Sequence, residues 1–230
     1  MDTSTTVIRG NSGDLFFDRL PDTTRKALFQ SAKMDVFSGS GWYLAGGTAL
    51  ALQVGHRQSV DLDFFTTRNN FNEVEVEKIL FASGKWSTDF REAGTIYGKL
   101  MGAKMSLIAY PFFVPSKAWV CFGTLRILPP SDIAAMKIIA VSQRGRKRDF
   151  VDLYWYCLHR ESLSTVIHRA IDSYPGQKHN LPHFIKSLTY FDDADKDPMP
   201  PLLFEVSWDG VKKFFREEAV KTAKELLGLN

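Results

Sequence analysis

The sequence predicts an α+β fold, in which a mixed β-sheet with flanking helices is followed by a helical C-terminal part. Between residues 42 and 128, short apolar runs rich in β-branched and aromatic residues are interrupted by glycine, proline and two helix-like segments. After Pro129-Pro130 the apolar residues recur at helical spacing to the end of the chain. We therefore expect a mixed α/β half over residues 12–128 and a helical half over residues 129–230.

The first part of the α/β half alternates between short helices and short strands. Apolar residues at helical spacing flank Pro21, and the run "WYLAG" ends in glycine as strands often do. We expect two short helices, a strand, a helix with Thr48 as its N-cap, and a second strand, over residues 13–35, 42–46, 48–54 and 59–65.

The second part of this half combines one helix with several strands. Residues 72–83 predict a helix that places Val74, Ile79 and Leu80 on its apolar side. From residue 85 to residue 128, short apolar runs are separated by Gly, Pro and Lys, which predicts antiparallel strands.

The C-terminal half reads as helical throughout. A loop over residues 192–203 precedes a long final helix, which Asp209 is expected to cap. The helices are predicted over residues 131–143, 147–160, 163–174, 181–191 and 210–227.

Composition is that of an ordinary globular protein. Of 230 residues, 44% are apolar and 24% are charged, and the net charge of +3 permits an anionic partner without requiring one. The N-terminus lacks the basic and apolar regions of a signal peptide, and no run of about 18 apolar residues predicts a membrane span. Cys121 and Cys157 have no metal-ligand spacing, so we expect two buried thiols and a reducing, cytoplasmic location without membrane association.

Asp61 and Asp63 interrupt an otherwise apolar strand prediction. Side chains two residues apart on a strand point to the same face, so these carboxylates should lie close together. Two like charges in partly apolar surroundings are costly unless a cation lies between them. A hard divalent cation with oxygen ligands, above all Mg²⁺, satisfies that requirement.

The turn Gly46-Gly47-Thr48 precedes this pair between a predicted strand and a predicted helix. Glycines let the backbone turn tightly and approach a ligand closely, and the first N–H groups of a helix attract anions. Each motif alone is more often structural. Their combination in strand–turn–helix–strand order indicates a phosphate site beside a metal site, which is what phosphoryl or nucleotidyl transfer requires.

These residues resemble a known family. The segment "LAGGTALAL…HRQSVDLDFF" is similar to the first motif of the DNA-polymerase-β-like nucleotidyltransferases, and in particular of the AbiEii-type nucleotidyltransferase toxins. The segment "AAMKIIAVSQRGRKRDFVDLYWY", residues 134–156, resembles the helical motif of that family. The segment "YFDDADKDPMPPLL…VSWDGVKKFF", residues 190–215, resembles its C-terminal stretch.

The resemblance implies a nucleotidyltransferase-like fold, a nucleoside triphosphate substrate and Mg²⁺ or Mn²⁺ held by Asp61 and Asp63. It also implies transfer of a nucleotide to tRNA, another RNA or a protein, and a cognate antitoxin as partner. The residues expected to contact the nucleotide are Gly46, Gly47, Thr48, Arg57, Lys137, Arg144 and Arg148. The residues expected to serve catalysis are Asp61, Asp63, Asp149 and Asp152.

The sequence departs from this pattern at one position. Many nucleotidyltransferases carry a third carboxylate on a later strand, whereas the corresponding run "AKMSLIAY" offers Ser106. Asp89 and Glu92 are the nearest acidic substitutes along the chain. A one-metal site, a base recruited from the C-terminal half and a weakened activity all remain open at this point.

The charged residues of the C-terminal half allow two interpretations. A lysine in an apolar helix, such as Lys137, often extends to the surface, whereas the family motif makes it a phosphate contact. The basic residues near Arg144 could pair with Asp149 and Asp152, with Arg148 four residues before Asp152, or could contact triphosphate or RNA. His56 is expected to be structural rather than a catalytic base.

The leading interpretation is a Mg²⁺-dependent nucleotidyltransferase, with toxin activity as the biological role. One alternative is a weakened or inactive nucleotide-binding or partner-binding protein of the same fold, which Ser106 motivates. Another is an antibiotic-modifying nucleotidyltransferase, against which the basic residues weigh because such drugs are cationic.

Overall fold

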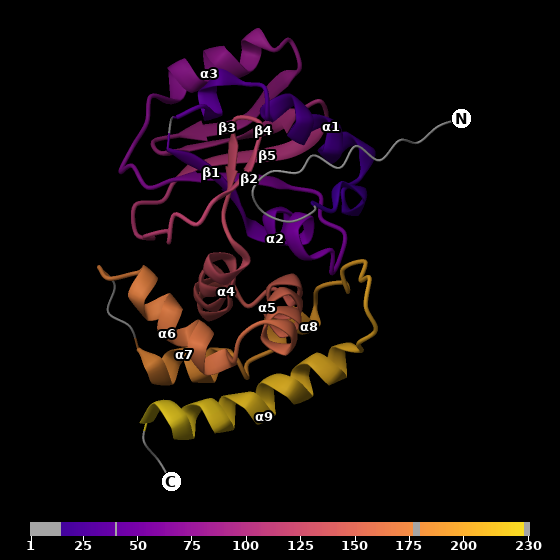
Figure 1. Cartoon of the computed structure of the whole chain (residues 1–230), viewed down its shortest axis with the longest axis vertical. Coiled ribbons are helices and arrows are strands. Elements are labelled where there is room, and N and C mark those ends of the chain that lie inside the picture. Colours follow the sequence, from indigo (N-terminus) through magenta and orange to yellow (C-terminus); the bar gives the residue numbers. More distant parts are fainter. Residues whose placement is uncertain (1–14, 40, 177–179, 228–230) are drawn as a thin grey trace. The chain divides into compact units, whose positions relative to one another are not determined.

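A computed structural model describes residues 15–39, 41–176 and 180–227. The chain forms two compact units (Figure 1). Unit 1 comprises residues 1–55, 59–111 and 117–129, and unit 2 comprises residues 56–58, 112–116 and 130–230. The main division falls between Pro129 and Pro130, where the sequence pattern changes. The single predicted boundary does not account for two short segments, 56–58 and 112–116, which belong to unit 2.

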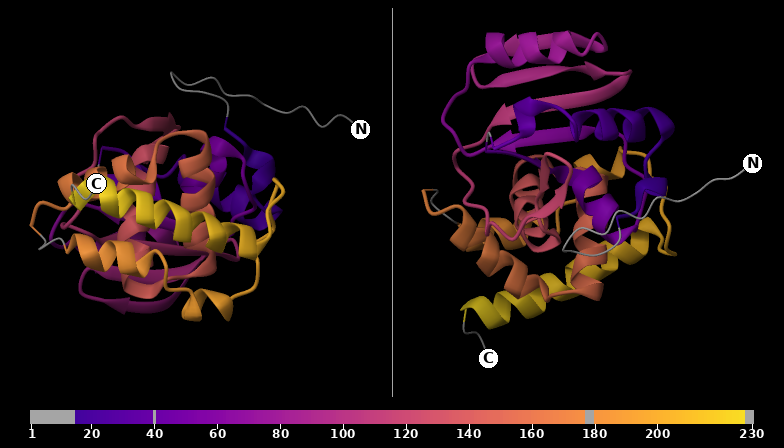
Figure 2. Two further views of the ribbon diagram at one scale, coloured as in Figure 1. Left: turned by 90° about the horizontal axis from the view of Figure 1, so that it is seen from below. Right: turned by 45° about the horizontal axis from the view of Figure 1, so that its top comes forward.

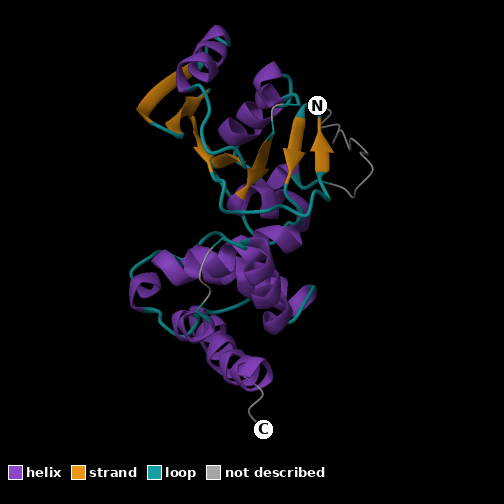
Figure 3. Cartoon of the chain, turned by 90° about the vertical axis from the view of Figure 1, so that its left-hand side faces the viewer, coloured by secondary structure: helices purple, strands orange, loops and turns teal. Residues whose placement is uncertain are grey.

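Unit 1 is built on one seven-stranded mixed sheet, and Figure 3 shows its strands in orange. The strand order is β3-β4-β5-β2-β1-β7-β6. The β5 strand runs parallel to β2, and β7 runs parallel to β1, so the expectation of only antiparallel strands after residue 85 is wrong for these two pairs. The strands are β1 Trp42–Ala45, β2 Leu62–Thr66, β3 Trp86–Glu92, β4 Thr95–Leu100, β5 Ala103–Ala109, β6 Val120–Phe122 and β7 Leu125–Ile127.

The helices of unit 1 are short, and side chains or glycines define several of their ends. Asn72 caps α3 by accepting a hydrogen bond from the Glu75 backbone N–H at 3.1 Å. Gly55 ends α2 in the left-handed conformation, with φ +67°. The helices are η1 Phe17–Arg19, α1 Asp22–Ser31, η2 Asp35–Phe37, α2 Gly46–Val54 and α3 Glu73–Ala82.

Four local predictions need correction. The first of the two helices expected around Pro21 is a single 3₁₀ turn, η1. Val74 is 49% exposed and does not lie on the buried side of α3. Cys121 is exposed because β6 lies at the edge of the sheet. Cys157, in unit 2, is partly buried, and burial raises the pKa of its thiol to about 12.

The helix α3 identifies the two faces of the sheet. Glu77 of α3 accepts hydrogen bonds from Thr88 and from Arg91, both on β3. The register shifts between Thr88 and Phe90, so Thr88 and Arg91 share a face although they are three residues apart. Their register partners on β4, Gly98 and Ile96, therefore lie on the α3 face as well. We call the other side of the sheet the open face; it bears Asp63, Ser106 and Tyr97, which are paired in register across β2, β5 and β4.

Helices make up most of the described part of unit 2, which also contains loops and an isolated β-bridge between Arg57 and Leu202; Figure 2 shows the long helix α9 in yellow. Helix α9 packs against α5, α6 and α7. Phe150 lies at the centre of an aromatic cluster, with its ring centroid 5.2 Å from that of Phe191 and 5.3 Å from that of Phe215. The helices are α4 Pro130–Arg144, α5 Lys147–His159, α6 Leu163–Ser173, α7 Leu181–Ser187, α8 Asp192–Asp195 and α9 Trp208–Leu227.

Two predictions in unit 2 are corrected as well. The expected loop over residues 192–203 begins with the short helix α8. The last helix begins at Trp208, so Asp209 lies in its first turn, and the Ser207 hydroxyl accepts the hydrogen bond of the Gly210 N–H at 3.1 Å. No helix among the described residues is long and apolar enough to cross a membrane.

Candidate active site

The turn at Gly46 brings the start of α2 against the carboxylate of Asp63. Strands β1 and β2 pair so that Ala45 lies opposite Asp63, and Gly46 follows at once with φ +71°. A Cβ atom added to Gly46 would lie 2.8 Å from Asp63 Oδ2. Glycine is therefore required here for its positive φ and for the space beside the carboxylate.

Thr48 supports the segment that leads into β2. It lies inside α2, which begins at Gly46, so the prediction that Thr48 is the N-cap is wrong. Its hydroxyl is 2.9 Å from Ser59 Oγ and also donates to the backbone carbonyl of Asp61. Thr48 thus fixes the approach of residues 59–61 to the sheet from a buried position.

Asp61 and Asp63 differ in their place relative to the strand. Asp63 lies in β2, whereas Asp61 lies one residue before this strand, which begins at Leu62 rather than at residue 59. Both aspartates are half-buried, while Leu62 and Phe64 between and beyond them are fully buried. The alternation within β2 places the carboxylate of Asp63 on the open face; that Asp61 shares this side stays a prediction.

Ser106 occupies the position beside Asp63 where a third carboxylate was expected. The two residues are register partners in the parallel pair β2–β5, and Ser106 Oγ donates to Asp63 Oδ1 at 2.7 Å. Asp89 and Glu92 lie on the edge strand β3, three strands from β2, which corresponds to about 14 Å. Neither can share one metal ion with Asp63.

The described residues contain no group of three or more His, Cys, Asp or Glu side chains that could hold a metal ion. Mg²⁺ is usually bound by one or two carboxylates, with waters and substrate phosphates as the remaining ligands. Asp61, Asp63 and the space left by Gly46 fit that pattern. The site therefore suits a metal that arrives with a triphosphate better than a metal held by protein ligands alone.

Unit 2 contains a separate group of charged residues, which we call the buried ionic cluster. It consists of His56, Arg57, Lys137, Asp149 and Asp152. Lys137 Nζ lies 2.6 Å from Asp149 Oδ1 and 2.7 Å from Asp152 Oδ2. Arg57 donates to both oxygens of Asp152, at 2.5 Å and 3.0 Å, and His56 Nε2 lies 2.8 Å from Asp152 Oδ1.

Burial and ion pairing set the protonation of the buried ionic cluster. Burial opposes the charge of Asp152, but Arg57 and Lys137 hold its pKa well below 3.8. Burial also opposes the charge of Lys137, yet Asp149 and Asp152 raise its pKa above 10.5. Burial lowers the pKa of His56, so its imidazole is neutral at pH 7 and Nε2–H donates to Asp152. The cluster is then electrically neutral, with two cations and two anions.

The expected catalytic and nucleotide residues of unit 2 differ in exposure. The side chains of Asp149 and Asp152 are 0% exposed and that of Lys137 is 8% exposed. Arg144 and Arg148 are exposed, and Arg144 Nε lies 3.5 Å from Asp149 Oδ2. The arginines reach solvent, whereas the two aspartates and the lysine are enclosed.

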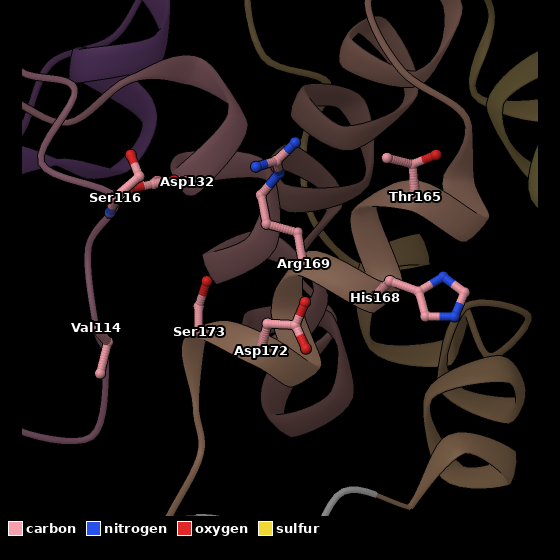
Figure 4. A pocket seen from close by; sticks show the side chains of 8 residues that line it. All are labelled: Val114, Ser116, Asp132, Thr165, His168, Arg169, Asp172 and Ser173. Atoms are coloured by element: carbon pink, nitrogen blue, oxygen red, sulfur yellow. Dashed lines mark hydrogen bonds between the residues drawn. The ribbon is translucent and has the colours of Figure 1, made fainter.

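The described residues of unit 2 include those that line the following two cavities. One, of about 250 Å³, is lined on its basic side by Arg144, His183 and Lys186. The other, of about 340 Å³, lies between residues 114–116 and helix α6, and Figure 4 shows Arg169 and Asp172 among its lining side chains. The Ser116 N–H donates to Asp132 Oδ2 at 2.7 Å in its wall, and none of the predicted site residues lines this second cavity.

Comparison with known proteins decides the family. The family model described as "Nucleotidyl transferase AbiEii toxin, Type IV TA system" matches residues 27–99 and 121–225. The chain belongs to the AbiEii nucleotidyltransferase toxin family. Both matched segments contain expected site residues, since Asp61 and Asp63 fall in the first and Lys137 and Asp152 in the second. Ser106 lies outside the match to the AbiEii family.

Individual proteins are similar to this chain in sequence or in structure, and the MenT4 structure supports the fold. An uncharacterised protein of Aquifex aeolicus (strain VF5) is 29% identical over 206 residues, which cover 87% of this chain and 96% of that protein. The nucleotidyltransferase toxin MenT4 of Mycobacterium tuberculosis H37Rv superposes with a TM-score of 0.52 at 16% identity, over 91% of this chain and 95% of MenT4. A Megavirus polyadenylate synthase gives a TM-score of 0.40 at 12% identity, over 70% of this chain and 34% of that protein.

Sequence reasoning missed several contacts of this AbiEii-family chain. The partner of Thr48 is Ser59, eleven residues away, and the partner of Asp63 is Ser106, on a parallel strand. A serine in an apolar strand gives no sign of its cross-strand neighbour. The polar residues inside otherwise apolar helices, Lys137 and Asp152, were the signal for the buried ionic cluster.

Proposed function

We propose that this AbiEii-family chain is a Mg²⁺-dependent enzyme that transfers a nucleotide from a nucleoside triphosphate to an RNA or protein acceptor. The observation that carries the proposal is the position of Asp63, between the Gly46 turn and Ser106. The two substrates in this proposal are the triphosphate and an acceptor that carries a hydroxyl group. The proposed biological role is that of the toxin in a toxin–antitoxin pair.

The proposed reaction forms one bond and breaks one. The oxygen of the acceptor hydroxyl attacks the α-phosphorus and loses its proton to solvent or to a nearby base. The bond from the α-phosphorus to the oxygen that bridges it to the β-phosphorus breaks, and pyrophosphate leaves with the electron pair. A bound Mg²⁺ supplies charge neutralisation at the phosphate oxygens.

The residues of unit 1 have distinct parts in this proposal. Asp61 and Asp63 hold the metal, and the Ser106 hydroxyl orients the Asp63 carboxylate by its hydrogen bond. Gly46, Gly47 and the backbone N–H groups at the start of α2 offer donors to the triphosphate. Thr48 acts from within by holding the backbone of Asp61 in place.

The residues of unit 2 divide into two groups. Arg57, Lys137, Asp149 and Asp152 form ion pairs with one another in the buried ionic cluster, and we assign them a positioning role for the segment 56–58 and helices α4 and α5. Arg144 and Arg148 are exposed, and their charge suits them to bind phosphate groups of a nucleotide or of RNA. An acidic residue of the cluster is a poor candidate for the base, because neither aspartate side chain reaches solvent.

The decisive experiment compares wild type with the variant Asp61→Asn/Asp63→Asn. Each labelled nucleoside triphosphate is incubated with Mg²⁺ and total RNA or cell protein, and label in the acceptor and released pyrophosphate are both measured. We expect the variant to lose at least about 100-fold in rate, because charge stabilisation at the transferred phosphate is removed. Circular dichroism checks that the variant is folded.

A matched control uses Asp22→Asn/Glu75→Gln, which removes two exposed carboxylates from α1 and α3 of the same unit. This control should transfer at the wild-type rate. Equal transfer by wild type and by Asp61→Asn/Asp63→Asn would show that the site is assigned wrongly.

One alternative keeps the site and omits the reaction. Ser106 at the position of a third carboxylate favours a protein that binds the nucleotide without transferring it. Calorimetry separates the two functions, because triphosphate binding with no pyrophosphate release from any acceptor supports the alternative.

A further inference from the structure

Two exposed aromatic side chains lie on the open face of the sheet in unit 1. Phe90 on β3 is 48% exposed and Tyr97 on β4 is 43% exposed. Their ring centroids are 6.0 Å apart and their planes differ by 24°, so the rings are nearly parallel. A third flat ring can continue such a stack.

The aromatic pair shares one row of the sheet with the candidate metal ligand. Phe90 is the register partner of Tyr97, Tyr97 of Ser106, and Ser106 of Asp63. Register partners point to the same face, and the α3 face is identified independently by the bonds of Arg91 to Glu77. Phe90, Tyr97, Ser106 and Asp63 therefore line up on the open face.

The spacing of the row suits a nucleic-acid strand that ends at the site. Neighbouring strands lie about 4.8 Å apart, so Tyr97 is about 10 Å and Phe90 about 14 Å from Asp63. Stacked nucleotides advance about 3.4 Å each along a strand, so three to four of them span this distance. A base on the aromatic pair can belong to the same strand whose terminal hydroxyl lies at Asp63.

Charged side chains border the pair on the same face. Lys99 on β4 lies two residues from Tyr97 and is the register partner of Lys104 on β5. Lys99 Nζ is also 3.4 Å from Asp89 Oδ1, and Lys104 is exposed. The two adjacent lysines can contact a phosphate of a nucleic-acid backbone. A protein acceptor has no such phosphates and would not require this contact.

We propose that Phe90 and Tyr97 form a stacking platform for an unpaired base of a nucleic-acid acceptor. The proposal rests on the proposed function and sharpens it, because it favours a nucleic acid over a protein as the acceptor. The platform contacts only the flat face of the base, so it accepts all four bases. The distance between the platform and Asp63 sets how far the stacked base lies from the reacting end of the strand.

The test measures binding of fluorescent single-stranded oligonucleotides by anisotropy, with catalysis blocked by omission of triphosphate. The probes are a twelve-nucleotide oligo(A) RNA, the same length of oligo(dA), and an RNA of equal charge with abasic sites near its 3′ end. Wild type should bind the base-bearing RNA about 5- to 150-fold more tightly than the abasic RNA, which is the range for one stacked base. The oligo(dA) probe shows whether the acceptor class includes DNA.

The variants Phe90→Ala and Tyr97→Ala should lose this preference, whereas Tyr97→Phe should keep it. The control Phe81→Ala removes an aromatic that is 52% exposed on α3 and should bind as wild type. The aromatic variants should leave the slope of affinity against salt unchanged, and Lys99→Ala/Lys104→Ala should reduce it. The platform is overturned if wild type binds the abasic RNA as tightly as the base-bearing RNA. It is also overturned if both alanine variants keep the wild-type preference for the base-bearing RNA.

The outcomes separate this proposal from the proposed function. Transfer of label to a protein, at equal rates in wild type and in the aromatic variants, supports the proposed function and overturns the platform. Base-dependent binding through Phe90 and Tyr97, with no transfer to any acceptor, supports the platform and refutes the transferase.

Discussion

Replacement of Lys137 by Met tests the buried ionic cluster most directly. Lys137 Nζ contacts Asp149 Oδ1 at 2.6 Å and Asp152 Oδ2 at 2.7 Å, and both aspartate side chains are fully enclosed. Arg57 is the other cation of the cluster, so Lys137→Met leaves two carboxylates with one buried positive charge. Loss of one partner of a buried ion pair costs about 3–5 kcal/mol of unfolding free energy. Such a loss is a large part of the ~5–15 kcal/mol that stabilises a typical domain.

A second substitution can restore neutrality. In Lys137→Met/Asp149→Asn, the charge of Arg57 balances that of Asp152, and the amide introduced at position 149 carries no charge that needs a partner. The double variant should therefore be more stable than Lys137→Met alone by about 1–3 kcal/mol, which is the usual coupling energy of contacting charges. The exposed lysine Lys213, on α9, gives a control in Lys213→Met, for which we expect little change.

Hydrogen exchange measured by mass spectrometry suits this test, because it reports unit 2 separately from unit 1. Amides of α4 and α5 should exchange faster in Lys137→Met and recover part of their protection in the double variant. Urea unfolding followed by circular dichroism gives a second measure. If Lys137→Met protects these amides as well as wild type does, or the double variant is no better than the single one, the cluster is not the neutral unit described above.

Two further predictions concern single residues. Gly46→Ala should lose metal-dependent triphosphate binding in calorimetry, because the new Cβ meets Asp63 Oδ2 and the left-handed φ costs about 1–2 kcal/mol. Gly84→Ala carries the same φ strain, at +68°, in open space and should bind normally; equal losses in both would contradict the reasoning. Because the pKa of His56 is lowered, the unfolded chain takes up its proton first, so stability from this residue is complete above pH 6.5 and is lost as pH falls below it. His56→Gln should therefore show a smaller loss of α5 protection than wild type between about pH 7.5 and about pH 5.5, and an equal loss would refute the assignment.

Local pattern predicted much of the fold. A short apolar run that ends in glycine placed β1, and helical apolar spacing placed α2 and every helix from α4 to α7, within a few residues. The double proline marked the main division of the chain. Errors fell at element ends. Threonine is favoured at helix N-caps, which led to the prediction for Thr48, but the helix begins two residues earlier, at Gly46.

The candidate site was predictable in part for the same reason. Asp61 and Asp63 are neighbours along the chain, so the strand period predicts that they lie on one side; β2 begins at Leu62 and contains only Asp63. The contacts of Asp152 were not predictable in the same way. Asp152 pairs with Lys137 and also with Arg57, which lies 95 residues away along the chain. Spacing within one helix had suggested Arg148 for Asp152, since helical neighbours are the only ones a single helix reveals.

By itself, the sequence determined the strand–turn–helix–strand order, the paired aspartates and the family resemblance. These features depend on residues close together along the chain, where backbone geometry fixes direction. The tertiary structure decided that Ser106 lies beside Asp63, that the charges of unit 2 neutralise one another in its interior, and that Phe90 and Tyr97 share a row with the candidate metal ligand. Strand register and helix packing join residues that are distant in sequence, and these long-range pairings leave no local period from which they could be inferred.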